Sequence, residues 1–289
     1  MSSNATRPPI VVVGSSNFDL TIQTDQLPGP SETVLGGEYC SWAGGKGANQ
    51  AVGLAKLGSP TVLVSKVGDD HYGKQILSYL EDQGLDVSNV GVDPTAPTGL
   101  ALITLDSAST RTIVVSPGAN NALTEADVDR VVNAAPQGSI VVTQLEIPVP
   151  TVEHLLRLAK RRGLHTVVHA SPAVPLPRGV LRLADVLVLN QSELNVISGR
   201  SAQHLETAAG AAELLLSDGV GTVLITMRQR GVLIARQPDA WPPTADDEAP
   251  RFVPGHKVVA TEGNVASSAF IAGLVHHLAE AGEGADLHG

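Results

Sequence analysis

The sequence is poor in cysteine, in basic residues and in long apolar runs, and each shortage excludes a class of protein. Cys40 is the only cysteine, so no intramolecular disulfide can form. With 19 basic against 29 acidic residues, no basic stripe is available for polynucleotide phosphates, and we expect no nucleic acid partner. No apolar run approaches the roughly 20 residues that span a bilayer, and residues 1–9 lack a hydrophobic signal core. We therefore expect a cytoplasmic protein without a membrane partner.

Aromatic residues are scarce as well. They make up 3% of the 289 residues while 43% are hydrophobic, so the core must consist mostly of Val, Leu, Ile and Ala. This mixture is typical of buried parallel strands covered by helices. A chain of this length can bury a large core, and it shows no internal repeat or linker. We expect a single domain over residues 1–289.

Short apolar segments alternate with helical patterns along most of the chain. The predicted strands are 10–14, 61–66, 140–143, 166–169, 186–189 and 222–226, and the predicted helices are 72–83, 150–162, 191–198 and 202–217. Repeated β-then-α units predict an α/β fold, with a parallel sheet, right-handed crossovers and helices on both faces.

Other segments have a different pattern. Residues 20–24 and 33–43 alternate apolar and polar side chains, which favours half-exposed strands in a small sheet outside the main core. Residues 98–105 and 110–115 form a predicted hairpin around a polar turn. Residues 238–254, rich in Pro, Asp and Ala, are predicted to form an exposed loop.

Polar residues follow the first strand, where open α/β sheets bind ligands. Asn17 and Asp19 have side chains suited to a polyol's hydroxyl groups, although, taken alone, an Asx turn capping the strand explains them better. In residues 44–50, glycines permit close backbone approach while Lys46 and Asn49 supply donors at a helix N-terminus. The spacing is not that of a Walker A motif. A simple helix-entry loop remains the alternative.

Two further strand ends carry carboxylates. Glu146 follows the strand at 140–143, where it either orients a sugar or lies on the surface at the sheet edge. Asn190 and Glu193 begin a predicted helix one turn apart. They suit a hydrated Mg²⁺ beside phosphates, but they also suit an N-cap with a capping-box glutamate. The spacing alone does not distinguish these two roles.

Taken together, these segments resemble the ribokinase family, the PfkB-type carbohydrate kinases. The matching stretches are VVVGSSNFDL, WAGGKGANQAVGLAKLG, KVGDDHYG, TGLALITLD, SPGANNALT, QLEI and NQSE. They occur in family order from Val11 to Glu193, and the resemblance continues more weakly to Leu278. It implies a ribokinase-like three-layer αβα sandwich with a small β-sheet lid, whose strands come from about 20–43 and 98–115. The lid is also a possible homodimer interface.

The resemblance implies ATP-dependent phosphorylation of D-ribose at O5, with Mg²⁺ and a monovalent cation such as K⁺. The implied sugar-binding residues are Asn17, Asp19, Gly45, Lys46, Asn49 and Glu146, with Ala101 and Ile113 on the lid side. The implied nucleotide-binding residues are Asn190, Thr226 and Gly231, and the implied metal-binding residues are Glu193 and Glu262.

The late segment departs from the family pattern. The family has Asp-Thr-Thr-Gly-Ala-Gly-Asp, whose last Asp is the general base and whose glycines form an anion hole. Here the base position is Ser268, and Val265-Ala266-Ser267 replace the anion-hole residues. A serine hydroxyl accepts protons poorly, and lost general-base catalysis typically costs about 10²–10⁴ in rate. Lost anion-hole donors could cost about 10²–10³ more.

Two more departures concern the nucleotide. The family's Thr-x-Gly-x-x-Gly loop lies at 226–231, with Arg228 at the first glycine, and the chain ends at Gly289 without the family's adenine-flanking loop. ATP binding is therefore in doubt. We expect a ribokinase-like enzyme impaired in this chain. The alternatives are a non-catalytic sugar-binding pseudokinase and a truncated or mis-assembled gene product. The sequence does not choose among ribose, deoxyribose and a nucleoside.

Overall fold

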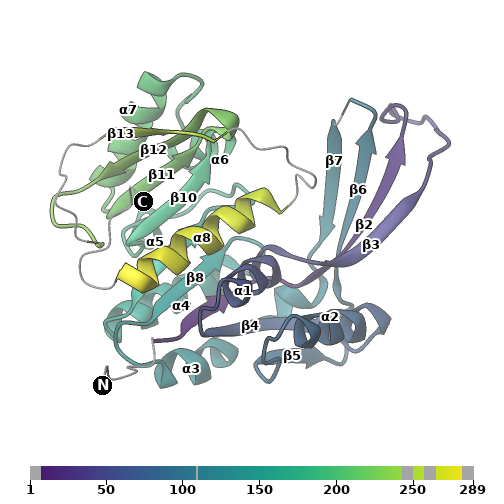
Figure 1. Ribbon diagram of the computed structural model, residues 1–289, viewed down its shortest axis with the longest axis horizontal. Helices are drawn as coiled ribbons and strands as arrows, with labels where there is room; N and C mark the ends of the chain where they lie inside the picture. Colours follow the sequence, from purple (N-terminus) through teal and green to yellow (C-terminus); the bar gives the residue numbers. More distant parts are fainter. Residues whose placement is uncertain (1–7, 109, 243–249, 257–264, 282–289) are drawn as a thin grey trace.

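A nine-stranded sheet forms the centre of the protein (Figure 1). The computed structural model describes residues 8–108, 110–242, 250–256 and 265–281. Along the sheet the strands are β13 (Arg251–Pro254), β12 (Gly231–Arg236), β11 (Thr222–Thr226), β10 (Val186–Asn190), β9 (His165–His169), β8 (Ile140–Gln144), β1 (Ile10–Val13), β4 (Thr61–Gly68) and β5 (Val90–Asp93). Neighbours from β11 to β5 pair in parallel, and β12 and β13 are added antiparallel.

Helices cover both faces of this sheet. The helices are α1 (Lys46–Lys56), α2 (His71–Asp82), α3 (Glu125–Ala134), α4 (Val149–Arg161), α5 (Arg178–Leu181), α6 (Gln191–Ser198), α7 (Leu205–Ser217) and α8 (Ala266–Ala281), with 3₁₀ turns η1 (Gly118–Ala122) and η2 (Arg228–Arg230). One apolar cluster includes α3, α4 and α7, and the other includes α1, α2 and α8. Alternate residues of β1 enter opposite clusters, because successive strand side chains point to opposite faces.

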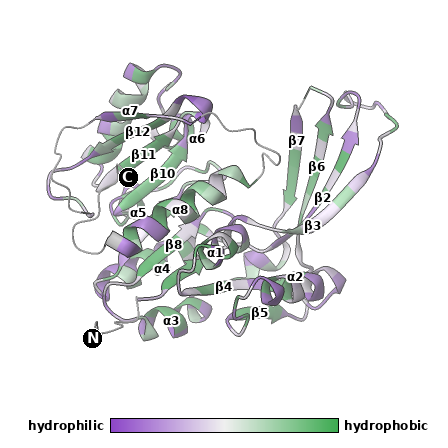
Figure 2. Ribbon diagram, viewed as in Figure 1, coloured by the Kyte–Doolittle hydropathy of each residue, from purple (hydrophilic) through white to green (hydrophobic). Residues whose placement is uncertain are grey.

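The central strands are apolar on both sides, as the low aromatic content and the Val-rich segments predicted. Figure 2 shows hydrophobic colour along the central strands and hydrophilic colour on the outer surfaces of the helices. All four residues of β1 are buried, and so are all five of β8. The predicted three-layer αβα arrangement is confirmed.

A second sheet of four strands stands apart from the first, as Figure 1 shows. Its order is β3 (Tyr39–Gly44), β2 (Asn17–Thr24), β6 (Gly99–Asp106) and β7 (Arg111–Ser116). We call this sheet the lid. Several apolar side chains of the lid are exposed, namely Ile22, Tyr39, Leu102, Ile113, Val114 and Val115.

Several sequence-based boundaries were wrong. The lid strand expected from residue 20 begins at Asn17, and the strand expected over 33–43 covers only Tyr39–Gly44. The segment before β3 contains paired glycines and prolines, which form ladders poorly. The loop expected over 238–254 ends in the edge strand β13, which is short and gives little periodic signal. Within the described ranges, no helix combines the length and apolarity that crossing a membrane requires.

Candidate sugar and nucleotide site

The strand order reverses between β1 and β8, and the candidate site lies there. From β1 the chain continues on one side to β4 and β5, and later it adds β8, β9, β10 and β11 on the other side. Connections that diverge in this way leave a crevice beyond the carboxyl ends of the two strands. Ser15 and Asn17 follow β1, and Glu146 follows β8. The topology therefore brings the two polar segments together.

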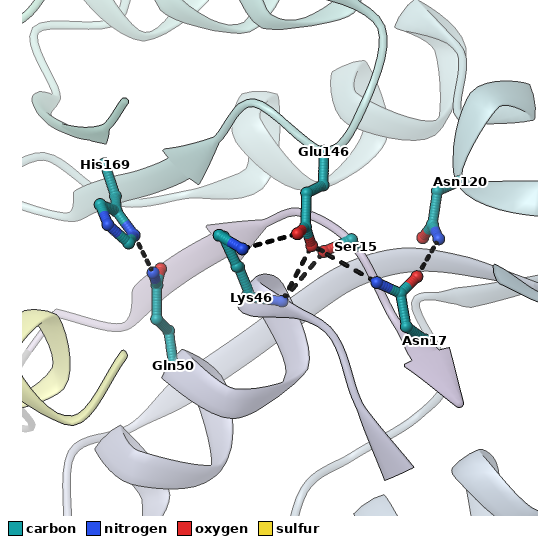
Figure 3. A network of polar contacts seen from close by, with 7 residues as sticks. All are labelled: Ser15, Asn17, Lys46, Gln50, Asn120, Glu146 and His169. Carbon is teal, nitrogen blue, oxygen red and sulfur yellow. Dashed lines mark hydrogen bonds and ion pairs between the residues drawn. The ribbon is translucent and has the colours of Figure 1, made fainter. Parts of the chain in front are cut away.

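Glu146 is the centre of the polar cluster (Figure 3). Its carboxylate accepts hydrogen bonds from the Ser15 hydroxyl at 2.5 Å, the Lys46 ammonium at 2.7 Å and the Lys46 backbone N–H at 3.2 Å. Burial alone raises the pKa of Glu146, but the Lys46 charge and these hydrogen bonds outweigh it, and the net pKa is lowered. Glu146 is thus a buried ionised group, and its alternative as a surface residue is wrong.

Asn17 is oriented by a residue of the turn that follows the last lid strand. Asn120, in η1, donates from Nδ2 to Asn17 Oδ1 at 2.7 Å and accepts from the Ser16 backbone N–H at 2.8 Å. The Asn17 amide group then faces Glu146, with Nδ2 at 3.5 Å from the carboxylate. Asn120 carried no assigned role in the sequence, although it lies within the matching stretch SPGANNALT.

Asp19 lies on the same face of β2 as Asn17, because strand side chains alternate. Its side chain is buried, yet Oδ1 has no hydrogen-bond partner among the described residues. Burial, followed by the negative charge of Glu146, raises the pKa of Asp19 to about 6, although the Lys46 charge and a hydrogen bond from Trp42 lower it. Asp19 therefore offers a free carboxylate oxygen next to an ion pair.

The two glycines before α1 are required by these neighbours. A Cβ on Gly44 would stand 2.3 Å from Asp19 Oδ2. Gly45 has φ of 91°, and a Cβ there would stand 2.6 Å from the Asn17 backbone nitrogen. Residues 44–50 both begin helix α1 and contact the polar cluster, so the ligand-loop and helix-entry interpretations of this segment are compatible.

The remaining expected sugar residues lie at the margin of the cluster. Asn49 is half-buried in the first turn of α1. Ala101 is buried beside Asp19 in the register of β2 and β6. Ile113 lies on β7 and is 46% exposed, and the register places Val115 rather than Ile113 beside Ala101.

On the expected nucleotide side, the polar groups of α6 bond to each other. The Asn190 side chain accepts from the Glu193 backbone N–H at 2.9 Å, and Glu193 accepts from the Asn190 backbone N–H at 2.7 Å. This is a complete capping box, one of the two readings that the spacing allowed. One carboxylate oxygen of Glu193 is thereby occupied.

The loop after β11 is shaped by local geometry. The Thr226 hydroxyl donates to the Leu189 carbonyl at 3.4 Å. A Cβ on Gly231, whose φ is 130°, would stand 2.0 Å from the Val253 carbonyl oxygen, so glycine is required there. Arg228 has φ of 54°, a left-handed conformation that costs a non-glycine residue about 1–2 kcal/mol.

Comparison with known proteins identifies the family of the chain. A sequence model described as pfkB family carbohydrate kinase matches residues 8–288. The chain belongs to this family. Among its relatives, the bifunctional ribokinase/ribose-5-phosphate isomerase A of Fructilactobacillus sanfranciscensis is 33% identical over 93% of this chain, which spans 48% of that protein. The deoxyribokinase of Salmonella typhimurium is 31% identical over 95% of this chain and 87% of its own length.

Solved structures confirm the fold. The ribokinase of Arabidopsis thaliana, complexed with ribose and ATP, aligns with a TM-score of 0.80 at 30% identity, over 95% of this chain and 86% of its own. The PfkB-family chain therefore has the ribokinase-like α/β fold with a separate lid, as the matching stretches predicted.

The first turn of α8 contains the position at which the family pattern predicts a base. Ser268 is 1% exposed, and Val265 precedes the helix, with its carbonyl accepting from the Ala269 N–H at 2.8 Å. Helix α8 packs against α1, where a Cβ on Gly53 would meet Ala272 at 2.7 Å. Glu262, expected to bind a metal, lies outside the described residues.

Proposed function

We propose that this PfkB-family protein binds a pentose, ribose or deoxyribose, beyond the carboxyl ends of β1 and β8. The observation that carries the proposal is a carboxylate oxygen of Asp19 that has no hydrogen-bond partner in the described part of the chain and lies beside the Lys46–Glu146 ion pair. A polyol hydroxyl both donates and accepts hydrogen bonds, so it suits a carboxylate acceptor next to an ammonium donor. Relatives with ribokinase and deoxyribokinase activity in their names support this substrate class.

The reaction that the family resemblance implies is the transfer of the ATP γ-phosphoryl group to the sugar O5. Glu193 keeps one carboxylate oxygen outside its capping box, which suits contact with a hydrated Mg²⁺ more than direct ligation. When bound, Mg²⁺ would neutralise charge on the phosphate oxygens. A K⁺ role for Glu262 stays a prediction.

We infer that phosphoryl transfer is impaired in this chain. The hydroxyl of Ser268 is a far weaker proton acceptor than a carboxylate, and losing a general base costs about 10²–10⁴ in rate. Val265 also adds a β-branched side chain where the family has an anion-hole glycine, and lost donors there cost about 10²–10³. The contrast between a prepared sugar cluster and this altered helix start also supports the second candidate, a sugar-binding pseudokinase.

Binding and turnover must be measured separately on the same preparation. Calorimetry with ribose, with 2-deoxyribose and with Mg-ATP is compared with a coupled kinase assay in K⁺ buffer. We expect pentose binding with turnover far below the ~10 s⁻¹ that is typical of enzymes. Turnover near that value contradicts the impairment, and failure of both pentoses to bind contradicts the sugar site. Pentose binding without ATP binding favours the pseudokinase.

The impairment has a gain-of-function test. Val265→Gly, Ser267→Gly and Ser268→Asp together restore the anion-hole glycines and the carboxylate, and we expect turnover to rise by at least about 10². The matched control places Ser268→Asn in the same double-glycine background, with the same shape but no base. Equal rates in the two triple variants would show that the carboxylate at this position is not the missing element.

We also propose that the lid forms a homodimer interface. Ile22, Tyr39, Leu102 and Val114 share one face of the sheet and are exposed, and β3 and β7 are unpaired edges within the described sheet. Exposed apolar faces and free edges favour association. Light scattering should report a dimer, and Val114→Glu should shift it to a monomer. A monomeric wild-type chain would contradict this proposal and leave the sugar site unaffected.

A further inference from the structure

A buried chain of hydrogen bonds joins three elements beside the sugar cluster, and Figure 3 shows its link between Gln50 and His169. Gln144, at the end of β8, donates from Nε2 to Gln50 Oε1 at 2.6 Å. Gln50, in α1, donates from Nε2 to Nδ1 of His169, at the end of β9, with 3.1 Å between the two nitrogens. Both glutamines are fully buried, and His169 is 4% exposed.

The order of donors and acceptors fixes the form of the imidazole. Because Gln50 Oε1 accepts from Gln144, its amide N–H faces His169, which must then offer a lone pair at Nδ1. Burial and the positive charge of Lys46 lower the pKa of His169 to about 4, although the charge of Glu146 raises it. His169 is therefore a neutral acceptor near neutral pH, with its proton on Nε2.

The hydrogen-bonded chain leads directly to the sugar cluster. Gln50 follows Lys46 by four residues in α1, so the two side chains lie on one face, one turn apart. The Lys46 backbone N–H and ammonium both donate to Glu146. A shift in the first turn of α1 would change both contacts. Gln50 is the buried side chain through which β8 and β9 hold that turn.

Gln144 has little freedom to move. A Cβ on Gly14 would stand 1.9 Å from Gln144 Oε1, so this oxygen occupies the space that glycine leaves free. The same oxygen is buried without a hydrogen-bond partner among the described residues. A buried oxygen without a hydrogen-bond partner costs free energy. The fold bears this cost at Gln144, whose amide nitrogen donates to Gln50.

We propose that His169 is a positioning residue for the sugar site: its Nδ1 lone pair holds Gln50 and thereby fixes the turn of α1 that places Lys46 against Glu146. This proposal rests on the proposed binding of a pentose by that cluster. None of the matching sequence stretches includes His169, and the residue lies between the sugar cluster and the Asn190 end of β10 in the strand order.

Two substitutions test separately the hydrogen-bond acceptor and the ring of His169. His169→Asn keeps an acceptor atom on Cγ, where the imidazole has Nδ1, while His169→Phe keeps a ring without any acceptor. Calorimetry with ribose should show roughly tenfold weaker binding for His169→Phe, the order expected when a buried donor is left unsatisfied, and near wild-type affinity for His169→Asn. His165→Phe, at the opposite end of β9, is the matched control and should keep wild-type affinity.

A double-mutant cycle tests the route through Gln50. In a Gln50→Leu background, His169→Phe should produce no further loss of affinity, because the contact it removes is already absent. Additive losses, or wild-type affinity in His169→Phe, would overturn the proposal. Equal weakening by His169→Asn and His169→Phe would overturn it as well, since the ring rather than the acceptor would then matter.

Two readouts need no sugar and keep the tests distinguishable. ¹⁵N NMR should show His169 as the neutral tautomer protonated at Nε2, with an Nδ1 signal that moves in Gln50→Leu. Hydrogen exchange of the Lys46 amide should accelerate in His169→Phe but not in His169→Asn. If no pentose binds the wild type, the proposed function fails. Unchanged Lys46 exchange in His169→Phe would overturn the positioning role by itself.

Discussion

Two regions beyond the carboxyl ends of the central strands carry polar residues of similar type in different states. At the sugar end, Asp19 keeps a buried oxygen that no described residue bonds, and Glu146 accepts hydrogen bonds from Ser15 and Lys46. At the nucleotide end, Asn190 and Glu193 bond to each other and cap α6. What distinguishes the sugar end is therefore the one carboxylate oxygen that the described structure leaves unsatisfied, since the polar groups of the capping box satisfy each other.

The difference also appears in stability. A buried carboxylate without a full set of partners destabilises the fold, whereas a capping box stabilises a helix. Binding groups commonly cost stability in this way. Substitutions at the sugar end should therefore weaken pentose binding, and substitutions in the capping box should reduce stability without changing pentose binding.

The largest effect should follow from Lys46→Met. This change leaves the Glu146 carboxylate, whose side chain is 8% exposed, without its ion-pair partner. Because the Lys46 side chain is 26% exposed, the loss should reach at most the ~3 kcal/mol that breaking a fully buried pair costs. Pentose binding should become undetectable by calorimetry, and urea unfolding should show the stability loss. The control is Lys74→Met, whose pair with Asp69 is exposed and should contribute under ~1 kcal/mol. Similar losses of stability and pentose binding in the two variants would contradict the distinction drawn between the sugar cluster and the rest of the surface.

Asp19→Asn should give opposite effects on stability and binding. At pH 7 the folded chain holds an ionised Asp19 whose pKa is raised to about 6, so the neutral amide should stabilise the fold by about 1–3 kcal/mol. Well below the ordinary pKa of 3.8, both the folded and unfolded chains carry a protonated Asp19, so the gain should vanish there. It should grow as the pH rises toward 6 and remain constant above it.

Urea unfolding at pH 4 and pH 7 measures the stability effect of Asp19→Asn, and calorimetry should show weaker pentose binding in the same variant. Asp69→Asn, at an exposed carboxylate, is the control and should change neither quantity appreciably. A destabilised Asp19→Asn at pH 7 would show that Asp19 is satisfied in the folded chain, and the contrast between the two ends would disappear.

The smallest effect should come from Asn190→Ala. Loss of the N-cap side chain should reduce the free energy of unfolding by about 1 kcal/mol. Pentose affinity should remain at the wild-type value, because α6 begins beyond β10, away from the sugar cluster. Weaker pentose binding in this variant, with unchanged stability, would mean that the end of β10 belongs to the sugar site.

Much of the architecture was predictable because its causes are local. The apolar runs at 10–14 and 140–143 match β1 and β8, and the Val-rich composition predicted strands buried on both faces. The short edge strand β13 gave no comparable pattern, and β3 began later than the alternation suggested. An edge strand depends on its neighbour for half of its stabilisation, so its own sequence specifies it weakly.

The site was predictable in part. The sequence pointed to Asn17, Asp19, Lys46 and Glu146 because each follows a strand or begins a helix. It gave no sign that Asn120 would orient Asn17, since the two lie 103 residues apart and meet only because the lid returns to its base. For Asn190 and Glu193 it allowed a ligand site and a cap, and only the folded structure shows the reciprocal hydrogen bonds.

The sequence by itself determined the strands, the helices, the glycine-rich entry to α1 and the absence of a carboxylate at Ser268, because these depend on residue identity and short-range periodicity. The tertiary structure decided which polar groups meet. Glu146 reaches Lys46 across 100 residues, and Gln50 reaches His169 across 119. Such contacts follow from the order of strands in the sheet and the placement of α1 upon it, which no local pattern encodes.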